Sequence, residues 1–144
     1  MSALKFHTES VKKEHIPEVI ALLQSISDFS PPENQIDRIW NEFESQPNVF
    51  SLVVIHQTRV VGYGSIIVST RIRGGRMGHV EDIVSHHDYR GKGIGKIIMS
   101  ALFEISKEQK CYKITLQCKE HNIPFYKKCH FQTSAITMQR FLTD

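Results

Sequence analysis

The chain has 144 residues, and 18 Lys and Arg against 15 Asp and Glu give it a formal net charge of +3. Hydrophobic residues make up 40% and charged residues 23%, which is typical of a single folded domain over residues 1–144 and excludes a disordered or low-complexity chain. The small positive excess permits a phosphate-bearing ligand, but it is too weak to indicate a protein that binds nucleic acid.

The cysteine count and the apolar pattern predict a cytoplasmic protein. Cys111, Cys118 and Cys129 are an odd number of cysteines, which does not favour a disulfide framework, so a reducing compartment is expected. Residues 1–9 lack the apolar core of a signal peptide, and no run of 18 apolar residues occurs in the chain. We therefore expect neither secretion nor a membrane partner.

Two amphipathic helices are predicted first. Apolar residues at helical spacing, from Ile16 to Ile26, predict a helix over roughly residues 15–28. Two prolines interrupt the pattern, and a second stripe from Ile36 to Phe43 predicts another helix that ends before Pro47.

Strands and one long helix follow. Residues 49–55 and 60–69 are rich in β-branched side chains and predict a hairpin. A basic loop over residues 71–77 leads to a further strand at 79–85. A helix begins inside the glycine-rich stretch 90–96, because apolar residues from Ile94 onward recur on one helical face.

The last third of the chain predicts a strand at 112–118, a short helix at 122–128 and a final strand at 131–141. The whole order indicates an α+β fold in which one sheet has helices on both faces.

The stretch 90–96 is the clearest functional signal. A glycine-rich turn at a helix start leaves backbone N–H groups free to bind an anion, and glycine has no Cβ to hold the anion away. Ile97 follows Lys96 where a P-loop needs Ser or Thr, and the spacing of the three glycines does not fit a Rossmann fingerprint. A glycine-rich helix start without a ligand is the alternative. The loop consists of Arg90, Gly91, Lys92, Gly93, Ile94, Gly95 and Lys96.

The residues from Arg90 to Gly95 resemble the R/Q-x-x-G-x-G/A signature of the GNAT superfamily, the GCN5-related N-acetyltransferases. The segments 78–84, 111–116, 122–129 and 138–141 are similar to those of glucosamine 6-phosphate N-acetyltransferases, and the similarity covers most of residues 49–144. The resemblance implies a GNAT fold with a central mixed, mostly antiparallel sheet whose central strands splay apart. It also implies acetyl-CoA as co-substrate, no metal, and a homodimer formed with the final strand.

The resemblance also implies roles for individual residues. Tyr126 matches the tyrosine that protonates the departing thiolate, and Asn122, four residues earlier, matches an asparagine that binds the pantetheine arm. Ile83 and Val84 would offer backbone groups to the pantetheine amides. Glu81 would bind or deprotonate the amine, through water.

Three further expectations concern the acceptor. Strict alternation along a strand predicts that Glu81 and Asp82 face opposite sides of the sheet, so Asp82 is expected to make a structural hydrogen bond beside the substrate. Gln117 stands where the resembled family has an acid that faces the amine. The third expectation is that arginines bind the phosphate of the acceptor, because a planar guanidinium can donate two hydrogen bonds to one phosphate group.

The phosphate contacts are assigned by resemblance to Arg71 and Arg73 in the basic loop, and to Arg140, which would reach a neighbouring subunit's sugar phosphate. Solvated surface charge is the alternative for the two loop arginines.

The predicted function is acetylation of D-glucosamine 6-phosphate to N-acetyl-D-glucosamine 6-phosphate, on the route to UDP-N-acetylglucosamine, by direct transfer in a ternary complex. Two alternatives stay open. In the first alternative the chain acetylates another small amine or a peptide amine. In the second it is a non-catalytic sensor that binds acyl-CoA.

Overall fold

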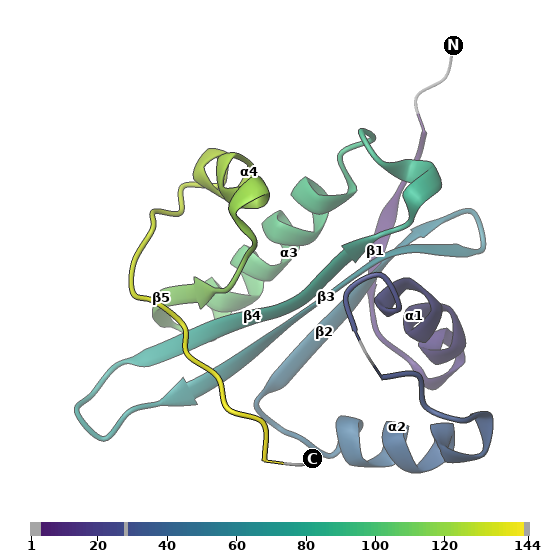
Figure 1. The fold of residues 1–144 in the computed structure, drawn as a ribbon, viewed down its shortest axis with the longest axis horizontal. Coiled ribbons are helices and arrows are strands. Elements are labelled where there is room, and N and C mark those ends of the chain that lie inside the picture. The colour runs from purple at the N-terminus through teal and green to yellow at the C-terminus, as the bar shows by residue number, and fades with distance from the viewer. Residues whose placement is uncertain (1–3, 28, 143–144) are drawn as a thin grey trace.

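A computed structural model describes residues 4–27 and 29–142 (Figure 1). The strands of its sheet are β1 (His7–Ser10), β2 (Val49–His56), β3 (Arg59–Thr70), β4 (Arg76–Ser85) and β5 (Cys111–Leu116). They lie in the order β1-β2-β3-β4-β5. Neighbouring strands are antiparallel from β1 to β4, whereas β4 and β5 are parallel. The mixed, mostly antiparallel sheet is therefore confirmed.

The helices are α1 (Ile16–Leu23), α2 (Ile36–Glu44), α3 (Ile94–Glu108) and α4 (Ile123–Lys128). Four 3-10 turns precede them or connect to them, η1 (Lys13–His15), η2 (Glu33–Gln35), η3 (His87–Tyr89) and η4 (Glu120–Asn122). Two parallel neighbours need a crossover connection, and α3 supplies it between β4 and β5. Within the described residues no helix is long and apolar enough to cross a membrane.

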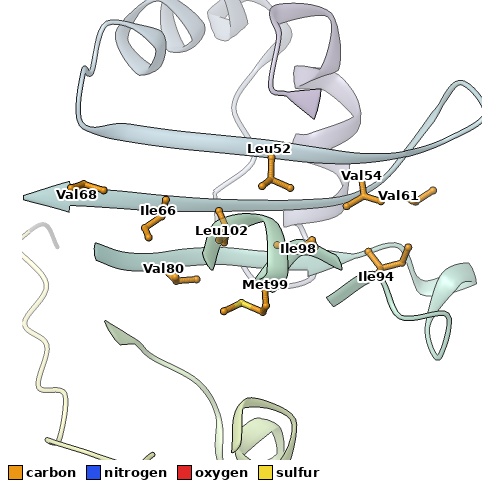
Figure 2. Close-up of a cluster of buried hydrophobic side chains, with 10 residues drawn as sticks. All are labelled: Leu52, Val54, Val61, Ile66, Val68, Val80, Ile94, Ile98, Met99 and Leu102. Atoms are coloured by element: carbon orange, nitrogen blue, oxygen red, sulfur yellow. The ribbon is translucent and has the colours of Figure 1, made fainter. Parts of the chain in front are cut away.

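The larger core lies between the sheet and α3. Figure 2 shows side chains of β2, β3 and β4 meeting Ile94, Ile98, Met99 and Leu102 of α3, and Ile98 and Leu102 are fully buried. A second core on the opposite face contains Val19 and Leu22 of α1. Because β2 and β3 are covered on both faces, their sequences are continuously apolar rather than alternating.

Two glycines of β3 allow α3 to approach closely. A Cβ on Gly62 would lie 2.6 Å from Ile94 Cγ2, and a Cβ on Gly64 would lie 2.4 Å from Ile98 Cγ2. Larger residues at these positions would push α3 away from the sheet and displace the loop that begins it.

The structure corrects two predictions and adds one strand. The first helix ends at Leu23, and Ile26 is 53% exposed, because the chain turns at residues 24–26. The short edge strand β1 was not predicted. Residues 131–141 form no strand within the described chain, since they pair with none of its strands. Residue 28, the last of the first predicted helix, lies outside the described residues.

Candidate active site

The sheet opens between β4 and β5. These strands pair from Arg76 opposite Cys111 to Val80 opposite Leu116, and β4 then continues to Ser85 paired with β3 but not with β5. The edge of β4 beyond Val80 therefore presents backbone groups to a gap where β5 would otherwise lie. The splayed central strands implied by the resemblance are present.

Ile83 and Val84 lie on this open edge, where the sequence placed them. Ile83 packs against the α3 core, and the side chain of Val84 is buried in the α1 core. Since both side chains face the interior, what these residues can offer a ligand is their backbone, which suits the predicted contact with an amide-bearing arm.

A β-bulge lies at the start of the open edge. Ser65 pairs with Glu81 and Tyr63 with Val84, so β4 contains one residue more than β3 over this stretch. Asp82 has φ +57°, a left-handed conformation that Asp tolerates better than most residues. Bulges of this kind often occur beside active sites and re-aim side chains.

The bulge changes which way the two acids face. Val80 and Ile83 both contact the α3 core, so strict alternation fails between them. Glu81 and Asp82 are both exposed, and the charges of both raise the pKa of the buried Tyr63 hydroxyl, although burial of that phenol is the larger cause. The strict alternation on which the predicted orientation of the two acids rested therefore fails at the bulge.

Asp82 also lacks the structural hydrogen bond expected of it. No side-chain or backbone partner for its carboxylate occurs in residues 4–27 and 29–142. The surrounding chain displaces enough water to raise the pKa of Asp82 above its ordinary value. A carboxylate with these properties is free to bind a cationic amine.

His79 adds a contact that sequence reasoning missed. Its Nδ1 lies 2.9 Å from Thr115 Oγ1 across the last paired part of β4 and β5, and its Nε2 lies 3.8 Å from Glu81 Oε1. The period of two along a strand was the available signal, because residues 79 and 81 share a side before the bulge.

The glycine-rich loop has the geometry of an anion site. Gly91 has φ +77° and Gly93 has φ +86° at the N-cap of α3. The first amides of the helix, at Ile94, Gly95 and Lys96, have no partner along the helix itself. The side chains of Arg90, Lys92 and Lys96 are exposed around these amides. Together they fit a pyrophosphate.

Two residues of this loop, Ile94 and Gly95, also have packing roles. The side chain of Ile94 is 2% exposed and anchors the helix start in the core, so only its backbone can face a ligand. A Cβ on Gly95 would lie 3.1 Å from the Phe125 ring, which means that Gly95 allows α4 to approach α3.

Tyr126 projects from α4 and stacks edge-on against Phe125 and Phe131, with ring centroids 5.0 and 5.9 Å away. Burial raises the pKa of its hydroxyl, and the thiolates of Cys118 and Cys129 raise it further when they form. The phenol is therefore protonated at neutral pH, as a general acid must be. Its hydroxyl has no hydrogen-bond partner among the side chains of the described chain.

Asn122 is the N-cap of α4, one helical turn before Tyr126, and its side chain is exposed. The two residues therefore lie on the same side of this short helix, as their spacing predicted. Gln117 follows the end of β5 and is exposed beside Cys118.

The three predicted phosphate-binding arginines lie in exposed segments outside the strands. Arg71 and Arg73 are exposed in the turn between β3 and β4. Five residues of extended β4, 76–80, lie between that turn and Glu81, so the six steps from residue 75 to Glu81 span about 20 Å at the usual rise per residue. Arg140 lies in the exposed segment 131–142, outside any strand. The assignment of Arg71, Arg73 and Arg140 to the sugar phosphate therefore stays a prediction.

Comparison with known proteins agrees with this geometry. The model of the acetyltransferase (GNAT) family matches residues 16–131. A relative from Dictyostelium discoideum, glucosamine 6-phosphate N-acetyltransferase 1, is 34% identical over 125 residues, which cover 83% of this chain and 80% of the relative.

Solved structures agree as well. The glucosamine-6-phosphate N-acetyltransferase of Arabidopsis thaliana superposes with a TM-score of 0.88 at 25% identity, over 96% of this chain and 99% of that chain. A Trypanosoma brucei acetyltransferase gives a TM-score of 0.87 at 28% identity, over 96% of this chain and 100% of that chain. The splayed sheet, the glycine-rich helix start and these likenesses lead to one conclusion: the chain belongs to the GNAT family of acetyltransferases.

Proposed function

We propose that the chain transfers the acetyl group of acetyl-CoA to the amine of D-glucosamine 6-phosphate, giving N-acetyl-D-glucosamine 6-phosphate on the route to UDP-N-acetylglucosamine. The observation that carries the proposal is the bulge of β4, which exposes Glu81 and Asp82 side by side at the mouth of the splayed strands. Named relatives with this activity support the same substrate.

The coenzyme is held by backbone and charge. The amides of Gly93 to Lys96 and the three cations of the loop bind the pyrophosphate. The pantetheine arm lies along the open edge of β4, where Ile83 and Val84 offer backbone groups, and Asn122 binds it from the opposite side. The thioester then lies between Glu81 and Tyr126.

The reaction is direct attack of the amine on the thioester. The neutral amine adds to the carbonyl carbon, the C–S bond breaks, and the thiolate takes the proton of the Tyr126 hydroxyl. The proton lost by the amine passes through water to Glu81, while Asp82 holds the amine in place. Burial raises the pKa of Cys129, which keeps that thiol protonated and is consistent with transfer without an acyl-enzyme.

An aminosugar amine also suits Gln117. An amide can orient a ligand but cannot take a proton. The electron-withdrawing oxygens of the sugar make its amine less basic than a lysine amine, so less help is needed to deprotonate it.

The dimer is part of the proposal. Ile136, Met138, Phe141 and Leu142 in the last described segment are each at least 79% exposed. A two-fold pair that covers them is the commonest arrangement, and it would allow arginines of one subunit, Arg140 among them, to reach the sugar phosphate bound by the other. We also expect the enzyme to work in the cytoplasm.

A thiol-release assay with acetyl-CoA tests the proposal. Glucosamine 6-phosphate should be acetylated far faster than glucosamine, spermidine or a lysine peptide. Faster turnover of an unphosphorylated amine would show that the substrate is another amine. Binding of acetyl-CoA without turnover of any amine would favour a non-catalytic acyl-CoA-binding sensor.

A further inference from the structure

We infer that Arg59, at the tip of the β2–β3 hairpin, is a positioning residue that holds the coenzyme loop, residues 90–96, through His86. Protonation of His86 then releases this loop. The inference rests on the proposed use of acetyl-CoA. It concerns the turn η3, which joins β4 to the loop at Arg90.

Arg59 reaches η3 by three contacts. Its Nη2 lies 2.9 Å from His86 Nε2 and 3.9 Å from Asp88 Oδ2. Its guanidinium carbon lies 5.9 Å from the centroid of the Tyr89 ring. Since arginine has no acceptor, it donates to the imidazole. One exposed arginine therefore contacts three of the four residues that precede the loop.

Aromatic packing completes the anchor. The Tyr89 ring meets Phe6, His56 and His86 at centroid distances of 6.1, 5.4 and 5.8 Å. The Tyr89 carbonyl accepts from the Lys92 amide at 3.1 Å. Displacement of Tyr89 therefore moves the backbone of the coenzyme loop directly.

The His86 ring lies between two donors. Arg59 donates to Nε2 when the neutral ring carries its proton on Nδ1, and the Asp88 amide, 3.1 Å from Nδ1, donates to that atom in the other neutral tautomer. A neutral imidazole accepts one of these hydrogen bonds, and a protonated imidazole accepts neither. The anchor therefore depends on the neutral form of His86.

The surrounding charges favour that neutral form. Burial lowers the pKa of His86, and the charges of Arg59 and His87 lower it further, while the Asp88 carboxylate opposes them. His87 stacks on His86 at a centroid distance of 4.5 Å, and His56 and Tyr89 are the other titratable groups packed nearby. Protonation below the ordinary histidine pKa then breaks the Arg59 contact.

The same cluster is a poor metal site. Ligand atoms of His86, His87 and Asp88 lie within 4.8 Å of one another. The guanidinium of Arg59 already occupies Nε2 of His86 and would repel a cation there. The cluster is better explained as an anchor for the loop than as a place for an ion.

The test compares Arg59→Met with Arg38→Met. Arg38 is a matched control, because it also forms an exposed ion pair, with Glu42 at 3.5 Å. Titration calorimetry at about pH 8 should show the Kd of acetyl-CoA raised about tenfold in Arg59→Met, the size expected when one charged hydrogen bond is lost. The Kd of Arg38→Met should equal that of the wild type.

His86→Asn isolates the titration, because asparagine keeps an acceptor for Arg59 and does not titrate. The wild-type protein should lose affinity for acetyl-CoA between about pH 8 and about pH 5.5, and His86→Asn should lose less. The coenzyme's own phosphate titrates equally in both experiments, so the difference reports His86. Equal pH dependence in the two proteins would overturn the switch.

Hydrogen exchange of the free protein makes the test independent of the proposed function. The amides of Arg90 and Lys92, which donate to the carbonyls of His87 and Tyr89, should exchange faster in Arg59→Met than in Arg38→Met, with unchanged exchange in α3 beyond its first turn. Faster exchange in Arg59→Met, together with no binding of acetyl-CoA by the wild-type protein, would support the anchor and refute the proposed use of acetyl-CoA. Unchanged exchange together with unchanged Kd would refute the anchor.

Discussion

Replacement of Gly93 by alanine separates the coenzyme loop from the fold. Gly93 has φ +86°, and no described atom lies within 4 Å of the position that a Cβ would take. The methyl therefore meets open space, and the loss of stability comes from the left-handed backbone alone, about 1–2 kcal/mol. In a chain of this size that loss lowers Tm by about 3–8 °C.

Gly74→Ala is the matched control. Gly74 has φ +94° and equally open surroundings, but it lies in the β3–β4 turn. Thermal denaturation should therefore show a similar loss of Tm in both variants. Only Gly93→Ala should lose acetyl-CoA affinity, because its methyl occupies the space in which the pyrophosphate approaches the backbone.

The expected loss of affinity follows from the hydrogen bonds. A bond to a charged group contributes about 1.5–3 kcal/mol, so loss of one raises Kd by about 10- to 150-fold. Titration calorimetry of both variants measures this directly. An unchanged Kd in folded Gly93→Ala, or an equal rise in Gly74→Ala, would refute the placement of the pyrophosphate.

Three further predictions follow from the proposed mechanism. Tyr126→Phe should lower kcat by about 100-fold with little change in the Kd of acetyl-CoA; wild-type turnover in a stopped assay would mean that solvent protonates the thiolate. Glu81→Gln should cost more kcat/KM than Gln117→Asp, since Glu81 takes the proton, and the reverse order in the same assay would contradict that role. Light scattering should give a dimer at micromolar concentration, and Phe141→Asp should weaken it; a monomeric wild-type protein would count against a site shared between subunits.

Most of the sheet could be predicted because its strands have clear local patterns of apolar and β-branched residues. The apolar runs of β2 and β3 and the helical stripe from Ile94 to Ile105 leave little choice of element. The segment 131–141 shows where this reasoning fails. Its apolar and β-branched residues favour a strand, but a strand also needs a hydrogen-bonding partner, which no local pattern supplies.

The site was predicted unevenly for a similar reason. The glycines at 91 and 93 mark positive φ in the sequence itself, so the anion loop could be located. The β4 bulge depends on the register between two strands, and one extra residue there reverses the alternation that placed Glu81 and Asp82 apart. The sign available in the sequence was the Asp itself, because Asp adopts a left-handed backbone more readily than most residues.

Asp82 combines two features that cost stability, a left-handed backbone and a carboxylate whose pKa is raised by loss of water. Because the folded pKa is above the ordinary value of 3.8, the folded chain binds this proton more tightly than the unfolded chain does. The ionised carboxylate therefore lowers the free energy of unfolding at pH values above the folded pKa, and this cost disappears as the pH falls below 3.8.

Asp82→Asn should consequently raise Tm at neutral pH, since asparagine tolerates the same backbone and carries no charge. The gain should shrink as the pH is lowered toward about 4. The same variant should lose about tenfold or more in kcat/KM, because a charged hydrogen bond to the amine is lost. Differential scanning calorimetry across pH and the thiol-release assay measure the two effects. A gain in Tm that does not depend on pH would mean that the carboxylate's charge is not its cause, and wild-type kcat/KM would remove Asp82 from the amine site. Stability gained together with activity lost is the result expected of a residue retained for function.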